Sequence, residues 1–178
     1  MNPDNSRKLI FPKYRVSDTF NKPLVIGIGN TFRGDDAVGP LVAHRLKEAA
    51  LPGITVLEHD GEGTALLALW EGYSTVILVD AAVSGAEPGT IHRWEAGGKG
   101  DSVDSPTRAA DHGLGVVEAI ELARRLGRLP ERFVVYGIEA GSFELGAELT
   151  TVVAQAAEDV VDRIGREVGG AAGSSTGD

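Results

Sequence analysis

The 178-residue sequence contains no cysteine. This absence excludes disulfide bonds, cysteine-ligated zinc, iron–sulfur clusters and thiol nucleophiles. The length is typical of a single domain, and 42% of the residues are hydrophobic. A domain of this size buries roughly 70% of the surface that its unfolded chain exposes. The sequence can therefore form a core without a disulfide or a structural metal.

Positive charge and long hydrophobic runs are also scarce. The formal net charge is −9, and no cluster of Lys and Arg interrupts the acidic surplus. An acidic protein repels phosphate backbones and anionic lipid surfaces, so neither a nucleic acid nor a membrane is expected as a partner. Residues 1–22 lack an apolar run of signal-peptide length, and no stretch approaches the roughly 20 apolar residues of a membrane span. We expect a cytoplasmic protein.

Three regions differ in composition. Residues 1–22 are polar and aperiodic and are interpreted as an N-terminal extension, residues 23–168 as the domain, and residues 169–178 as a flexible tail of small residues. Within the domain, strand-like apolar runs alternate with segments of helical periodicity. The predicted strands are residues 23–30, 54–61, 74–83, 89–96 and 132–140, and the predicted helices are residues 39–50, 64–72, 112–127 and 149–168.

This alternation requires crossover connections, which produce parallel strands covered by helices. We therefore predict an α/β fold of three layers: one twisted, mostly parallel, five-stranded sheet with helices on both faces. The imperfect alternation of residues 89–96 predicts an edge strand, and Gly127 is expected to end its helix. In such sheets, functional sites form at the carboxyl ends of the strands.

The first strand leads into the sequence GIGNTFRGDD at residues 27–36. Its glycine pair resembles the dinucleotide pattern G-x-G-x-x-G, but Phe32 occupies the position of the third glycine. A phosphate site also needs free backbone N–H groups and no neighbouring anions. Here Asp35 and Asp36 would repel a phosphate, so a cation suits this loop better. A nucleotide- or phosphate-binding α/β module remains the rival interpretation.

One aspartate of this pair is expected to cap a helix, and Asp35 is the better candidate for that role. Asp36 is then free to face a cleft. Asp80 ends the apolar run 76–80, where a carboxylate is costly unless it caps a turn, is paired or binds a metal. His112 begins a predicted helix, where an exposed histidine is the simpler interpretation. His59 is a weaker candidate for a supporting role beside such a site.

Asp36, Asp80 and His112 come from three separate strand–helix units whose ends converge in the predicted fold. Two carboxylates and one imidazole form a metal site that leaves coordination positions open. Without a metal, the two carboxylates would raise each other's pKa. The other two histidines are weaker candidates, because His44 lies off the apolar stripe of its helix and His92 lies on the edge strand.

Five segments, in the same order along the chain, resemble the hydrogenase maturation endopeptidases that process the large subunit of nickel–iron (NiFe) hydrogenases. These segments are GIGNTFRGDDAVGP (27–40), HDGEGTALL (59–67), VILVDAAVSGAEPGT (76–90), HGLGVVEAIELAR (112–124) and YGIEAGSFELGAELT (136–150). The resemblance implies a twisted α/β sheet and removal of a C-terminal extension from the large-subunit precursor once nickel is installed. It also places the family's metal-contacting positions on Asp36, Asp80 and His112, although some members carry Glu where this chain has Asp36.

On this interpretation nickel is supplied by the substrate precursor, and no organic cofactor is required. Water would attack the scissile peptide, activated either by the metal or by a carboxylate acting as general base. Gly29 and Asn30 are expected to support the cleft by allowing close approach of the backbone. A hydrolase with its own zinc is a further alternative. The sequence leaves the cleavage site, the particular large subunit and the oligomeric state open.

Overall fold

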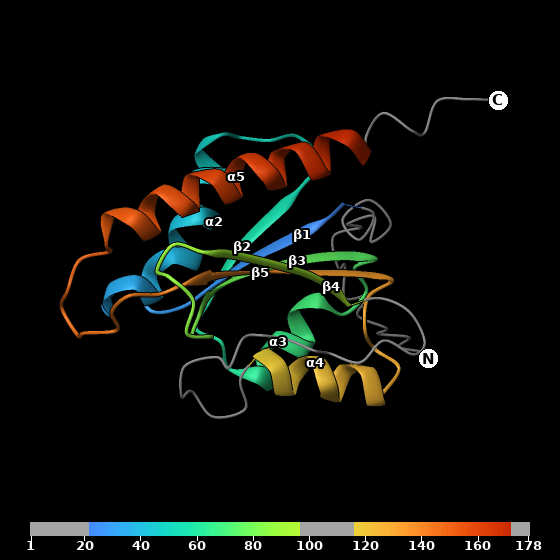
Figure 1. The fold of residues 1–178 in the computed structure, drawn as a ribbon. Coiled ribbons are helices and arrows are strands. Elements are labelled where there is room, and N and C mark those ends of the chain that lie inside the picture. Colours follow the sequence, from blue (N-terminus) through green and yellow to red (C-terminus); the bar gives the residue numbers. More distant parts are fainter. Residues whose placement is uncertain (1–21, 97–115, 172–178) are drawn as a thin grey trace, which may run out of the picture.

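The computed structural model describes residues 22–96 and 116–171, and its helices and strands alternate along the chain as predicted (Figure 1). The strands are β1 (Leu24–Ile28), β2 (Thr55–His59), β3 (Thr75–Ala82), β4 (Ile91–Ala96) and β5 (Arg132–Glu139). The helices are the short 3₁₀ helix η1 (Gly34–Ala37) and the α-helices α2 (Val38–Glu48), α3 (Gly63–Trp70), α4 (Val116–Arg125) and α5 (Thr151–Ala171).

One five-stranded sheet has the order β2-β1-β3-β5-β4. The first four strands in this order are parallel, and β4 pairs antiparallel with β5 at the edge. The prediction of a mostly parallel sheet with residues 89–96 at its edge is therefore confirmed. β1 and β3 are neighbours at the centre, so the chain segments that follow them leave the sheet side by side.

Helices cover both faces of the sheet (Figure 1). Helices α2 and α5 pack on one face, and α3 and α4 pack on the other. Side chains alternate along β3 between the two cores: Ile77 and Val79 belong to the α2–α5 core, whereas Val76 and Leu78 belong to the α3–α4 core. This alternation places Asp80 on the α3–α4 face, at the carboxyl end of β3.

The helix ends agree with the sequence predictions within a few residues. Gly127 has φ +64° and follows α4 in a Schellman motif, with its N–H donating to the Arg124 carbonyl and the Arg128 N–H donating to the Ala123 carbonyl. Helix α5 starts two residues later than predicted and continues past residue 168, to Ala171.

Three ranges lie outside the described residues: 1–21, 97–115 and 172–178. They contain most of the predicted N-terminal extension, most of the predicted tail and the start of the predicted helix 112–127. Among the helices of the described part, none is both long and apolar enough to cross a membrane.

Candidate functional site

Glycines allow η1 to lie close to the carboxyl ends of the central strands. A Cβ on Gly39, in the first turn of α2, would lie 2.2 Å from the Ile28 carbonyl oxygen and 2.5 Å from the Val79 carbonyl oxygen. Gly29 has φ +140°, and a Cβ there would lie 1.9 Å from the Asp36 carbonyl oxygen. The expected close approach at Gly29 is therefore confirmed. Since only glycine fits at both positions, Gly29 permits η1 to pack against the end of β1, and Gly39 permits α2 to pack against β1 and β3.

Asp36 lies in η1 and is only 4% exposed. Its Oδ2 accepts a hydrogen bond of 3.1 Å from the backbone N–H of Asn30. This contact ties the Asn30 backbone to Asp36, and the expected support of the cleft by Asn30 stays a prediction. The Asp36 N–H donates to the Arg33 carbonyl, so the main chain at this residue is also fixed. Asp36 is thus a buried carboxylate in a loop of defined geometry.

Asp80 is half-buried on β3, and the backbone N–H of Ala81 donates to its Oδ1 at 2.8 Å. The pKa of the Asp80 carboxyl is raised to about 7, mainly by burial and to a smaller extent by the charge of Asp36, against the lowering effect of the Ala81 hydrogen bond. Because η1 contacts β3, the charge of Asp36 lies near enough to act on Asp80. The predicted rise in pKa is therefore present at Asp80. A divalent cation between the pair would remove this repulsion.

His112, the third predicted ligand, lies outside the described residues. Residues 22–96 and 116–171 contain no group of three His, Asp or Glu side chains placed to hold a metal ion. Of the three predicted site residues, the structure describes Asp36 and Asp80, and the charge of Asp36 acts on Asp80. The roles of Asp36, Asp80 and His112 as metal ligands stay predictions.

The loop between β1 and η1 has little capacity to bind a phosphate, because its backbone donors are already used. The N–H groups of Asn30 and Phe32 donate to side-chain oxygens of Asp36 and Asn30. The N–H groups of Arg33 and Asp35 donate to the carbonyls of Asn30 and Ser142. A phosphate site at this position would need several of these groups free. The hydrogen bonding disfavours the nucleotide-binding interpretation.

The prediction that Asp35 caps its own helix is wrong. Neither η1 nor α2 has a side-chain cap, and Asp35 is completely buried. Its carboxylate accepts hydrogen bonds from the backbone N–H groups of Gly141 (2.7 Å), Ser142 (3.1 Å) and Thr150 (2.7 Å), and from the Thr150 hydroxyl (3.1 Å). Asp35 therefore fixes the connection between β5 and α5 to the loop that carries Asp36.

His59 and His44 have local roles. The Nδ1 atom of His59 accepts the N–H of Gly61 at 3.0 Å, which shapes the turn after β2. A supporting role for His59 beside the carboxylate pair stays a prediction. His44 is exposed and pairs with Glu48 at 3.4 Å on the surface of α2. This exposure agrees with the predicted position of His44 off the apolar stripe of its helix.

A further buried carboxylate, Glu139, is absent from the sequence predictions. It ends β5 and accepts hydrogen bonds from the backbone N–H groups of Ser84 and Gly85 (2.7 and 2.8 Å) and from the Ser84 hydroxyl (2.8 Å). Burial alone would raise the pKa of Glu139, but these bonds outweigh it and lower the pKa. The strand-end rule that selected Asp80 also applies to Glu139 and could have found it. Glu139 fixes the connection that follows β3.

The same cluster contains a serine and a histidine but lacks the geometry of a catalytic triad. Ser84 Oγ lies 3.4 Å from His92 Nε2, and Glu139 Oε2 lies 3.2 Å from the same nitrogen. In a triad the nucleophile and the orienting carboxylate engage opposite ring nitrogens. Ser84 also donates its hydroxyl hydrogen to Glu139. The cluster therefore connects neighbouring segments of the fold and is not a catalytic triad.

These features define an α/β protein of three layers with a coupled carboxylate pair at the carboxyl ends of β1 and β3. The chain belongs to the hydrogenase maturation protease family, whose family model matches residues 40–167, and it is a peptidase of that family. The loop with Asp36 precedes the first matched residue.

Individual relatives agree with this assignment. The chain is 31% identical over 144 residues to the hydrogenase expression/formation protein HupD of Bradyrhizobium diazoefficiens, covering 78% of this chain and 73% of HupD. It is similar to the crystal structure of a nickel–iron hydrogenase maturation protease, HycI, from Thermococcus kodakarensis, with 28% identity, a TM-score of 0.61 and coverage of 85% and 96% of the two chains. The hydrogenase maturating endopeptidase HybD of E. coli shares the fold, with a TM-score of 0.64, 21% identity and coverage of 80% and 89%.

Proposed function

We propose that this protein removes the C-terminal extension of a nickel-loaded nickel–iron hydrogenase large-subunit precursor. Asp36, Asp80 and His112 complete the coordination of nickel that the precursor already carries. Membership of the hydrogenase maturation protease family supports the substrate class. The single observation that carries the site is the contact of η1 with β3, through which the charge of Asp36 acts on Asp80, because two neighbouring carboxylates favour a cation between them.

The ligand set favours transient binding of a metal carried by the substrate over permanent binding of a metal by this protein. The chain has no cysteine, and an oxygen- and nitrogen-based set holds nickel less tightly than a set with thiolates. Binding to the precursor's nickel places the scissile peptide beside the carboxylate pair, which is a positioning effect. Water then attacks the peptide carbonyl carbon. This design makes cleavage depend on the nickel content of the substrate.

The test is incubation of the purified protein with nickel-loaded and nickel-free precursor, followed by mass spectrometry of the products. We expect loss of the C-terminal peptide from the nickel-loaded precursor only. Asp36→Asn, Asp80→Asn and His112→Ala should each lower the cleavage rate by at least about 10²-fold, because each removes a ligand. Asp159→Asn on the exposed surface of α5 is the matched control and should cleave normally.

Retention of cleavage by His112→Ala would remove the third ligand from this proposal. Equal cleavage of both precursors would show that nickel is not recognised. Metal analysis of the purified protein separates the rival zinc hydrolase, which would retain tightly bound zinc. Thermal stabilisation by NAD or ATP, without stabilisation by nickel, would favour the phosphate-binding rival.

A further inference from the structure

Two large hydrophobic side chains are exposed on adjoining turns beside the candidate site. Phe32 is 73% exposed and Leu145 is 77% exposed. Their turns are joined by a hydrogen bond of 2.8 Å from the Gly146 N–H to the Phe32 carbonyl. Single exposed hydrophobic residues are common on soluble proteins, whereas grouped ones mark interaction sites. Phe32 and Leu145 therefore place two exposed apolar side chains on joined turns, which we call the apolar patch.

The turn that carries Phe32 is held rigidly. The Phe32 N–H donates to Asn30 Oδ1 at 2.9 Å, and the Arg33 N–H donates to the Asn30 carbonyl at 3.1 Å. These bonds prevent the turn from folding Phe32 into the core. The protein therefore holds the backbone of an exposed aromatic residue in a fixed place, which lowers the entropy cost of binding a partner there.

The turn that carries Leu145 is fixed to the same loop. The carboxylate of Asp35 binds backbone N–H groups at Gly141, Ser142 and Thr150, on both sides of Leu145. Asp35 also precedes the candidate ligand Asp36. The buried carboxylate of Asp35 therefore fixes the turn of Leu145 relative to η1, which carries Asp36.

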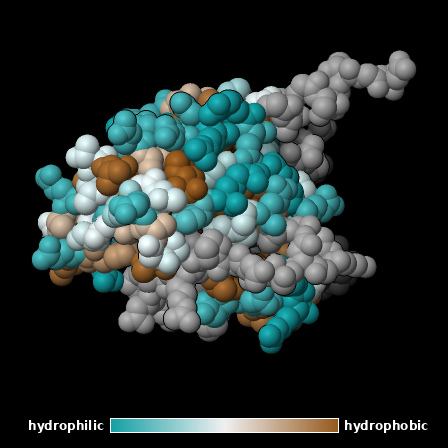
Figure 2. All heavy atoms as spheres, viewed as in Figure 1, coloured by the Kyte–Doolittle hydropathy of each residue, from teal (hydrophilic) through white to brown (hydrophobic). Residues whose placement is uncertain are grey.

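A surface hollow of about 350 Å³ lies next to this patch. Its lining is formed by Thr31, Ala37, Pro40, Leu41 and Leu149, together with the polar residues His44 and Glu58. Thr31 precedes Phe32 and Ala37 follows Asp36 in the chain, so the hollow borders both the turn of Phe32 and η1. In Figure 2, brown and tan spheres gather at the left, over the first turn of α5 and the connection that precedes it. We call Phe32, Leu145 and this hollow the apolar rim.

We propose that the apolar rim binds hydrophobic side chains of the large-subunit precursor, in the polypeptide segment next to the scissile bond. This inference rests on the proposed function. A peptide cleaved beside Asp36 must pass over the surface that adjoins η1, and the apolar rim is continuous with that surface through Ala37. Coordination of nickel then makes cleavage depend on the presence of the metal in the precursor. Binding to the apolar rim makes cleavage depend on the polypeptide sequence of the precursor.

The test measures steady-state cleavage of nickel-loaded precursor by Phe32→Ala, Leu145→Ala and the double variant. Each single variant should raise KM about tenfold, since burial of a Phe or Leu side chain typically accounts for at least that factor in affinity. The kcat should stay within about twofold, because neither side chain touches the carboxylate pair. The melting temperature should not fall, because both side chains are exposed.

Leu126→Ala is the matched control. Leu126 is 55% exposed and lies just after α4, before the start of β5 and therefore away from the carboxyl ends of the strands. Its KM should equal that of the unaltered protein. Phe32→Leu should recover most of the loss of Phe32→Ala, because it restores an apolar side chain.

An unchanged KM in the double variant, with normal cleavage by the unaltered protein, would overturn this inference alone. An equal rise in KM for Leu126→Ala would overturn it as well. Absence of cleavage by the unaltered protein would overturn the proposed function and this inference together. If light scattering showed that the unaltered protein is a dimer and the double variant a monomer, with equal KM, the apolar rim would be a contact between copies of this chain.

Discussion

At the level of single residues, the pKa of Asp80 predicts how the metal-free protein responds to pH. The folded-state pKa of about 7 exceeds the unfolded value of about 3.9, so the folded protein binds this proton more tightly. The stability from this group is present at low pH and is lost as the pH rises from about 4 to about 7. Above pH 7 the Asp80 carboxylate is ionised beside Asp36, which lowers the free energy of unfolding.

Asp80→Asn should remove that cost while keeping the shape of the side chain. In chelator, the free energy of unfolding of the variant at pH 8 should exceed that of the unaltered protein by about 2 to 4 kcal/mol. At pH 4 the two should agree within about 0.5 kcal/mol. Urea unfolding at both pH values measures the difference. Asp159→Asn is the control, and a constant difference for Asp80→Asn at the two pH values would contradict the assigned cause.

At the level of elements, the fit between α2 and the central strands depends on Gly39. A methyl group there would lie within 2.5 Å of backbone atoms of Ile28 and Val79, which cannot rotate away. Gly39→Ala should therefore lower the free energy of unfolding by at least about 3 kcal/mol, near or beyond the usual range for overpacking. Thermal and urea unfolding measure this loss.

Gly165→Ala in α5 is the opposite case of the same substitution. Its nearest neighbour would be Leu51 Cδ1 at 3.8 Å, an ordinary contact. Alanine favours the helix over glycine, so this variant should be more stable by about 0.5 to 1 kcal/mol. If Gly39→Ala were tolerated as well as Gly165→Ala, the close contact of α2 with β1 and β3 would not exist.

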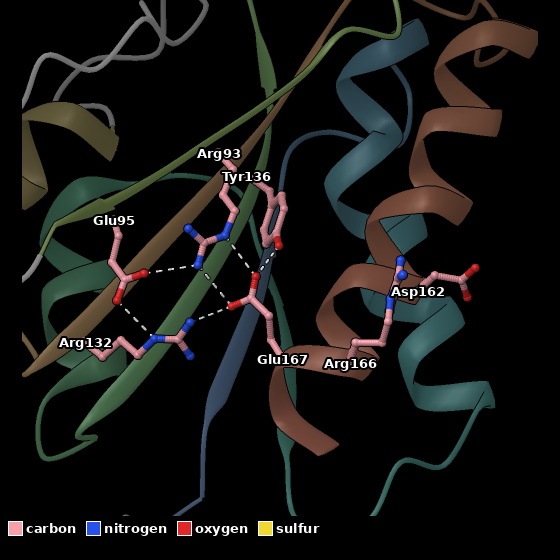
Figure 3. A network of polar contacts seen from close by, with 7 residues as sticks. All are labelled: Arg93, Glu95, Arg132, Tyr136, Asp162, Arg166 and Glu167. Atoms are coloured by element: carbon pink, nitrogen blue, oxygen red, sulfur yellow. Dashed lines mark hydrogen bonds and ion pairs between the residues drawn. The ribbon is translucent and has the colours of Figure 1, made fainter. Parts of the chain in front are cut away.

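At the level of the whole molecule, a polar network joins the C-terminal part of α5 to the sheet edge (Figure 3). Glu167 accepts hydrogen bonds from Arg93 (2.9 Å), Arg132 (2.6 Å) and the Tyr136 hydroxyl. Burial would raise the pKa of Glu167, but these three donors outweigh it and lower the pKa to about 2. Glu95 also pairs with both arginines, so the network spans β4, β5 and α5.

Glu167→Gln should lower the free energy of unfolding by about 1 to 2 kcal/mol at pH 7, because it removes the charge that binds the two arginines. A lowered pKa stabilises the fold above the unfolded value of about 4.3, and this stability is lost as the pH falls through about 2. The difference from the unaltered protein should therefore shrink below pH 4 and nearly vanish at pH 2. Glu131→Gln, on an exposed position, is the control for urea unfolding at pH 7 and pH 3. An equal loss at both pH values would show that the ion pairs contribute nothing.

The sequence by itself determined the alternation of strands and helices, the mostly parallel sheet, the edge position of residues 89–96 and the helix end at Gly127. These features follow from local periodicity and backbone preference, which each segment carries on its own. The sequence also placed Asp36 and Asp80 at strand ends, and parallel strands bring such ends together. For this reason the carboxylate pair could be predicted without coordinates.

Only the tertiary structure decided which partners the other polar groups have. Asp35 resembles a local cap in the sequence, yet it binds Thr150, 115 residues away. Glu139 ends β5 and Asp80 lies near the end of β3, but donors 53 to 55 residues earlier in the chain satisfy the carboxylate of Glu139. Phe32 breaks a glycine pattern in the sequence and proves to be an exposed ring on a rigid turn. Such partnerships depend on how distant segments pack, and local sequence patterns contain no information on that packing.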